Sequence, residues 1–116
     1  MSVKILSVAK QLPKHTRETK DIIPFVKLWM QGQETRFQRK VLKLFEGAGV
    51  DRRYSIMDAE EVFLNSSFED KNKIYVREVT TLAEQSLKKS LEKASLQPTD
   101  IDYIITVSCT GIMIPS

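Results

Sequence analysis

The stretch that decides the fold is Tyr103 to Ser116, which reads YIITVSCTGIMIPS. Its first five residues, Tyr103 to Val107, form a nearly continuous apolar run of the kind that a strand buried on both faces requires. The nine residues that follow lie where open α/β sheets place their sites, beyond the carboxyl end of a strand. Gly111 permits a sharp turn at this point. The residues alone favour the simpler interpretation, an ordinary strand end with a turn.

A long amphipathic helix is predicted just before this run, and Pro98 and Asp100 make the turn between the two. A helix that leads into a buried strand indicates an α/β layered fold. The buried stripe of this helix is expected to hold six apolar residues: Val76, Val79, Ala83, Leu87, Leu91 and Ala94.

The first half of the chain is expected to open with a strand over Val3 to Ala9, where apolar and polar residues alternate. Thr19 can cap a short helix, with Pro24 tolerated in its first turn. A short helix through Leu64 should begin at Asp58. Between these two short helices, a further helix that begins after Gly32 should place four residues on one apolar face: Phe37, Val41, Leu44 and Phe45.

The composition is that of one globular domain, with 116 residues of which 41% are hydrophobic and 28% charged. The sequence shows no secretory signal and no apolar run of membrane-spanning length, so we expect a cytoplasmic location and no membrane partner. Cys109 is the single cysteine and His15 the single histidine. A disulfide framework and a structural metal site are therefore not expected.

The charges are unevenly distributed. Residues 1–57 hold 12 Lys/Arg and 5 Asp/Glu, whereas residues 58–116 hold 6 and 10. An anionic partner should therefore meet the first half. There Arg36, Arg39 and Lys43 stand at i, i+3 and i+7 of the predicted helix, on one face, and could converge on a diphosphate. Without further information, a solvated helix face is the more common explanation of such a stripe.

Three motifs together resemble the type III polyketide synthases, the chalcone synthase family. They are Phe37 to Arg39 (FQR) with its basic flanks, Gly49 to Tyr54 (GVDRRY), and Ser108 to Ser116 (SCTGIMIPS). The resemblance implies that residues 1–116 are the N-terminal part of a thiolase-like αβαβα domain and end before the nucleophilic cysteine. One departure is visible, because the segment between Lys43 and Arg52 is about four residues longer than in the plant enzymes.

The resemblance also implies roles for single residues. Arg36, Arg39 and Lys43 would bind the phosphates of coenzyme A, Cys109 and Thr110 would line the acyl pocket, and Met113 and Ile114 would lie at a homodimer interface. No catalytic residue is expected in these 116 residues. The sequence around Cys109 also argues against a nucleophile, because no base or cation stands near it. A buried, inert thiol is expected there. His15 is expected in a solvent-exposed loop.

The family carries out decarboxylative Claisen condensation of an acyl-coenzyme A starter with malonyl-coenzyme A. This implies thioester substrates, no separate cofactor, a homodimer and no nucleic-acid partner, with the 116 residues inactive alone. Two alternatives remain open. One is an initiating ketoacyl synthase of fatty-acid synthesis, which shares the GVDRRY-like run and uses an acyl carrier protein. The other is a non-catalytic acyl-coenzyme A binding or dimerisation module.

Overall fold

The computed structural model describes residues 2–64, 67–109, 111 and 113. The chain divides into two compact units. One is Pro13–Phe68, and the other combines Met1–Leu12 with Glu69–Ser116.

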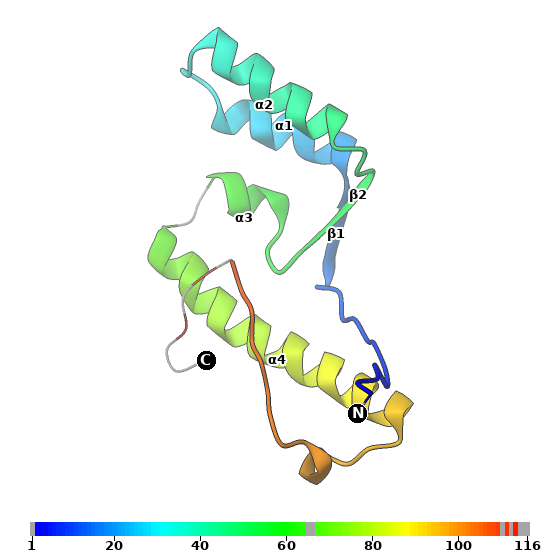
Figure 1. Cartoon of the computed structure of the whole chain (residues 1–116). Coiled ribbons are helices and arrows are strands. Elements are labelled where there is room, and N and C mark those ends of the chain that lie inside the picture. The colour runs from blue at the N-terminus through cyan, green and yellow to red at the C-terminus, as the bar shows by residue number, and fades with distance from the viewer. Residues whose placement is uncertain (1, 65–66, 110, 112, 114–116) are drawn as a thin grey trace. The chain divides into compact units, whose positions relative to one another are not determined.

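The unit Pro13–Phe68 combines three helices with a two-stranded antiparallel ribbon. Helices α1 and α2 lie side by side, and the ribbon continues from them (Figure 1). In chain order the elements are β1 (His15–Glu18), α1 (Thr19–Trp29), α2 (Thr35–Gly47), β2 (Arg52–Ser55) and α3 (Ala59–Leu64).

The core of this unit is built on one face of α1. Ile22, Val26 and Met30 follow one another at intervals of four residues, so they share a face, and Ala59 of α3 completes the buried cluster. Val26 and Met30 are fully buried. Five partly buried residues pack against this cluster: Phe25, Val41, Leu42, Phe45 and Phe63.

The ribbon presents one half-buried face and one exposed face. Its register pairs His15 with Ser55 and Arg17 with Arg53, and these four residues are half-buried. The alternating residues, such as Tyr54, are exposed, as the two-residue period of a strand requires. The sequence did not predict this ribbon, because its strands are short and polar. The expectation for His15 is corrected as well, since this residue lies in a strand and is half-buried.

Helix α1 differs from the prediction at its start. Its N-cap is Glu18, whereas Thr19 is the first helical residue. The Thr19 hydroxyl donates a hydrogen bond to the Val50 carbonyl instead, and the Thr19 backbone N–H donates to the Asp51 carbonyl at 2.7 Å. Because the helix begins there, Pro24 lies inside it and beyond the first turn. Pro24 is exposed, so water can reach the carbonyl that proline leaves without a donor.

Helix α2 buries a slightly different face from the predicted one. Val41, Leu42 and Phe45 pack toward the core, whereas Leu44 is 72% exposed. The face of α2 that packs toward the core is therefore centred on Val41 and Phe45. Phe37 lies at the edge of this face, with its ring centroid 6.5 Å from that of Trp29.

The second unit is organised by one long helix, α4 (Phe68–Ala94), which is followed by a 3₁₀ turn, η1 (Pro98–Asp100). The N-terminal segment and the segment after η1 both run along this helix (Figure 1). Ser7 Oγ and Ser90 Oγ are 2.6 Å apart, and Lys93 Nζ donates to the Val8 carbonyl at 3.1 Å. These hydrogen bonds tie the N-terminal segment to the C-terminal half of α4.

Two predicted strands are not strands in this structure. Val3 to Ala9 and Tyr103 to Val107 form no strand, and most of their apolar side chains are exposed, for example 96% at Val3 and 93% at Val107. A strand needs a neighbouring strand, and the sheet found among the described residues pairs only β1 with β2. The predicted stripe of α4 is likewise not buried, and Leu87 is 51% exposed.

Candidate functional site

The basic stripe predicted from the sequence lies on α2. Arg36, Arg39 and Lys43 are exposed, on the side of the helix opposite to Val41 and Phe45. The periodicity that directs the apolar residues toward α1 therefore directs the cationic residues toward solvent. This placement leaves the guanidinium and ammonium groups free to reach a common point.

The structure brings these three residues together around one open hollow of about 560 Å³. The hollow is also lined by Lys40 of the same stripe, which makes four cationic side chains on one wall. Lys40 was not among the predicted site residues, although its i+4 spacing from Arg36 would have identified it. The complete lining is Glu34, Thr35, Arg36, Arg39, Lys40 and Lys43.

The electrostatics of this hollow favour an anion. Within the described ranges, none of its four cationic side chains forms a salt bridge with a carboxylate. Glu34, at the N-cap of α2, is the single acidic residue in the lining. Several unpaired cations on one wall create a local positive potential that attracts phosphate groups.

The predicted pocket residues belong to the second unit. A hollow of about 850 Å³ lies beside α4, and Met113, which is half-buried, forms part of its lining. Tyr75 also lines it, and its hydroxyl is 2.5 Å from Ser108 Oγ, within hydrogen-bonding distance. The Tyr75 ring also lies where a Cβ on Gly111 would stand. Tyr75 was not predicted, because nothing in the sequence links it to a segment more than thirty residues away.

Cys109 departs from the expectation of burial. It is a free, exposed cysteine and does not line the hollow that contains Ser108 and Met113. The run before it, Tyr103 to Val107, is exposed as well. Thr110 and Ile114, the other residues predicted for the pocket and the interface, lie outside the described residues.

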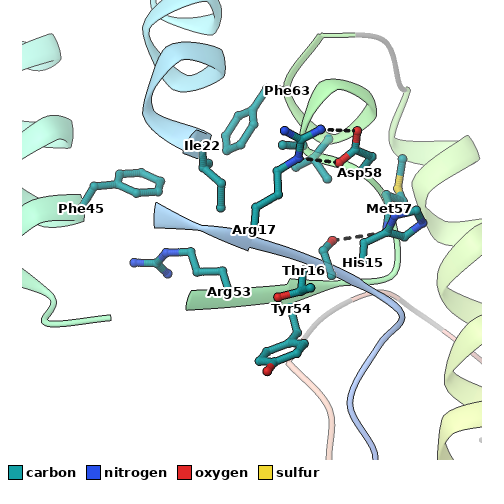
Figure 2. Close-up of a pocket in the computed structure, with 13 residues that line it drawn as sticks. His15, Thr16, Arg17, Ile22, Phe45, Arg53, Tyr54, Met57, Asp58 and Phe63 are labelled. Carbon is teal, nitrogen blue, oxygen red and sulfur yellow. Dashed lines mark hydrogen bonds and ion pairs between the residues drawn. The ribbon is translucent and has the colours of Figure 1, made fainter. Parts of the chain in front are cut away.

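A further hollow, of about 240 Å³, lies between the ribbon and the helices of the first unit. Figure 2 shows Arg17 reaching across it to Asp58. Arg17 Nε donates to Asp58 Oδ1 at 2.7 Å, and Nη2 donates to Oδ2 at 2.8 Å. This bidentate hydrogen bonding, aided by the Ala59 backbone N–H, lowers the pKa of Asp58 to about 2.

Metal-binding clusters and membrane-spanning helices are both absent from the part of the chain that the structure describes. No group of three or more His, Cys, Asp or Glu residues stands close enough to hold a metal ion. No described helix combines the length and the apolar character that crossing a membrane demands.

The chain is similar in sequence to three bacterial enzymes, although no protein-family model matches it. It is 43% identical over 75 residues to 1,3,6,8-tetrahydroxynaphthalene synthase of Streptomyces coelicolor, and 36% identical over 76 residues to the enzyme of that name from Streptomyces griseus. It is 28% identical over 74 residues to phloroglucinol synthase of Pseudomonas fluorescens. These alignments cover 64–66% of the chain but only 20–21% of each relative.

A solved structure is similar over nearly the whole chain. The crystal structure of 1,3,6,8-tetrahydroxynaphthalene synthase from Streptomyces coelicolor, described as a bacterial type III polyketide synthase, matches with a TM-score of 0.77 and 30% sequence identity. The match covers 95% of this chain and 32% of that protein. The chain thus corresponds to about a third of that enzyme.

Proposed function

We propose, on the premise that this chain is related to the bacterial type III polyketide synthases in sequence and in fold, that it supplies the coenzyme A entrance of such an enzyme. The carrying observation is a set of four cations on the exposed side of α2 that form no salt bridge with any described residue: Arg36, Arg39, Lys40 and Lys43. In this proposal these side chains bind the phosphates of an acyl-coenzyme A or malonyl-coenzyme A substrate.

The local geometry supports this role in two ways. Guanidinium groups donate paired hydrogen bonds to phosphate oxygens, and a lysine adds a point charge, so a mixed Arg/Lys stripe suits a diphosphate. The hollow also includes Thr35 and Arg36, the first residues of α2, where the helix dipole favours an anion. Glu34 opposes the anion and limits the affinity.

For the complete enzyme we propose the reaction that the relationship implies. Malonyl-coenzyme A loses carbon dioxide, and its α-carbon attacks the thioester carbonyl of the bound acyl group, which forms a new carbon–carbon bond and releases a thiolate. The relatives are named for two polyhydroxylated aromatic compounds, so the product is expected to be an aromatic polyketide. The 116 residues contribute Cys109 and Thr110 to the pocket wall and Met113 and Ile114 to a homodimer interface, and no catalytic residue.

Titration of coenzyme A into the chain, followed by calorimetry, tests the phosphate site. We expect Arg39→Ala and Lys43→Ala each to weaken binding about two- to fivefold, because an exposed ion pair contributes about 0.5–1 kcal/mol. Pantetheine, which has no phosphate, should bind all variants equally weakly. Raising the salt concentration should reduce the difference between coenzyme A and pantetheine, because exposed ion pairs are screened.

Lys27→Ala is the matched control. Lys27 is an exposed lysine in the last turn of α1 that does not line the hollow, so its removal changes the net charge without touching the site. Equal weakening in this variant would reduce the effect to net charge. Unchanged affinity in both Arg39→Ala and Lys43→Ala would remove the phosphate assignment.

A further inference from the structure

The 240 Å³ hollow of the first unit is separate in composition from the basic hollow on α2, since the two share no lining residue. Its floor is the half-buried face of the ribbon, and its walls come from α1, the end of α2 and the segment through α3 (Figure 2). The lining is His15, Thr16, Arg17, Ile22, Phe45, Arg53, Tyr54, Ser55, Met57, Asp58, Ala59, Val62 and Phe63.

The walls of this hollow are largely apolar. Ile22 and Met57 are buried, and the rings of Phe45 and Phe63 add aromatic surface. The floor is different, because the ribbon places two arginines directly opposite each other, Arg17 and Arg53. Like charges in this position repel one another, so a ribbon of this kind needs a compensating anion.

Among the described residues, Arg17 has a carboxylate partner and Arg53 has none. Both oxygens of Asp58, the single carboxylate in the lining, already accept hydrogen bonds from Arg17. Arg53 forms no salt bridge within the described ranges, and its Nε atom is buried without a hydrogen-bond partner. Its guanidinium lies 5.1 Å from the centroid of the Phe45 ring, a contact that engages the face of the group but not its N–H donors.

A buried N–H donor without an acceptor is costly, and a cation beside an apolar cavity is a strong recognition element for an anion. A carboxylate has two oxygens that match two N–H donors of one guanidinium. A phosphate would bring further oxygens into a hollow whose walls are mostly apolar, at the cost of burying polar atoms without partners. The apolar walls suit a hydrocarbon or aromatic ring attached to the carboxylate.

We propose that this hollow binds a small monocarboxylic acid with an aromatic or branched aliphatic body, whose carboxylate pairs with Arg53. The volume lies below the roughly 300–1,000 Å³ of sites for drug-sized ligands, so a ligand of about ten non-hydrogen atoms is appropriate. The carboxylate can come from a free acid or from a side chain of another polypeptide segment. Both sources share the same chemistry at Arg53.

Benzoate is a suitable probe, and benzamide is its neutral counterpart of the same shape. In titrations of the ¹⁵N-labelled chain followed by NMR, benzoate should produce saturable shifts at β2 and at the end of α2. Benzamide and inorganic phosphate should not. Arg53→Met should weaken benzoate binding about tenfold or more, because a charge-assisted hydrogen-bonded pair is lost. Arg53→Lys should give an intermediate loss, because lysine retains the charge without the paired donors.

Arg52→Met provides the matched control, because Arg52 is the adjacent arginine on the exposed face of the same strand. It carries the same charge change and should bind benzoate normally. Circular dichroism on each variant verifies that the helices persist, and Arg53→Lys keeps the test informative if Arg53→Met fails to fold. Equal shifts with benzamide, or full affinity in Arg53→Lys and Arg53→Met, would overturn the proposal.

The same assay distinguishes the two sources of the carboxylate, a free acid and a protein side chain. A short peptide with one glutamate, flanked by alanines, should bind more weakly than benzoate if the natural ligand is a free acid, because its backbone does not fit the volume. Tighter binding of the peptide than of benzoate would assign the site to a protein side chain. Absence of saturable binding by either probe would overturn the carboxylate site itself.

Discussion

Arg17 and Asp58 show how single residues hold the first unit together. They are 41 positions apart in sequence, and their bidentate pair connects β1 to the residue just before α3. The Arg17 guanidinium also lies 5.2 Å from the centroid of the Phe25 ring. The pair therefore joins the ribbon, α1 and α3 at one point, where loss of either member would leave a charge in a partly apolar setting.

Asp58→Asn should lower the thermal stability of the chain at pH 7, because it removes the charge that Arg17 pairs with. The folded-state pKa of Asp58, about 2, lies below its ordinary value of 3.8. The stabilisation is therefore fully present above the ordinary value and lost as the pH falls toward 2. Melting curves from pH 7 to pH 2 should show the difference between wild type and variant shrinking below about pH 4.

Glu46→Gln is the control for this measurement. Glu46 is an exposed acid in the last turn of α2 and forms no salt bridge with the residues that the structure describes. Its substitution therefore removes the same charge without breaking an ion pair. Its melting temperature should follow the wild type at every pH. A difference for Asp58→Asn that stays constant down to pH 2 would contradict the role of its ionisation.

For single residues, the sequence predicts positions that depend on the period of a helix. It does not predict contacts that depend on residues far away in the chain. The helical period predicts that Arg36, Arg39 and Lys43 share one face, and the resemblance implies that they bind phosphates. Arg53 stands in the GVDRRY run that was recognised from sequence. Its unpaired donor depends on Phe45, Arg17 and Asp58, whose positions no local pattern fixes.

Helix α4 ends with mild backbone strain at its C-terminus. The Leu96 N–H donates to the Leu91 carbonyl at 3.0 Å and the Ser95 N–H donates to the Glu92 carbonyl at 3.1 Å, which is the hydrogen-bond pattern of a Schellman motif. This motif places Ser95 in the left-handed region with φ of 56°. Glycine occupies such a position without steric cost, whereas serine does not.

Ser95→Gly should therefore stabilise the chain, by about 0.5–1 kcal/mol, because it removes the steric cost of the left-handed conformation. Urea unfolding followed by circular dichroism measures this change. Gln85→Gly is the contrasting variant, since Gln85 is an exposed residue inside the helix and its replacement should lower the stability by about 0.5–1 kcal/mol. A destabilised Ser95→Gly protein would show that the terminal conformation carries no cost.

Elements were predicted well where their stability is local. The helices that became α2, α3 and α4 were located from caps and periodicity, and the 3₁₀ turn follows the predicted Pro98 to Asp100 turn. The strands expected at Val3 to Ala9 and Tyr103 to Val107 did not form, because strands require neighbours that a local pattern cannot supply. The ribbon of β1 and β2 formed from residues with no strand signature, since each strand supplies the other's hydrogen bonds.

At the scale of the whole molecule, the resemblance to the type III polyketide synthases is confirmed by the sequence and structural relatives. The expected α/β fold class, the N-terminal part of a thiolase-like fold, is confirmed by the structural match over 95% of the chain. The assignments of Arg36, Arg39, Lys43, Cys109, Thr110, Met113 and Ile114 stay predictions. Motifs identify a family more readily than they establish what each residue does.

The chain should self-associate, because two extended apolar segments are exposed. Ile105 is 89% exposed and Ile5 is 85% exposed, and extended segments with such exposed apolar side chains favour pairing with another copy. Light scattering after size-exclusion chromatography should show a dimer or a larger species as the concentration rises. Ile105→Lys should shift the population toward monomer, because a charged side chain disfavours pairing at an edge.

Gln85→Lys serves as the reference for this shift, since Gln85 is an exposed polar residue of α4 and receives the same positive charge. This variant should associate like the wild type. A wild-type chain that stays monomeric at high concentration would count against association through these segments.

The hydrogen bonds that join Ser7 to Ser90 have a consequence for the order of events during protein synthesis. The two residues are 83 positions apart, so the first segment leaves the ribosome long before its partner helix exists. At about 5–20 residues per second the delay is roughly 4–17 s. During that interval the Ser7 hydroxyl has no helix to bond to, and the apolar residues Ile5 and Leu6 beside it are open to a molecular chaperone that recognises short apolar segments.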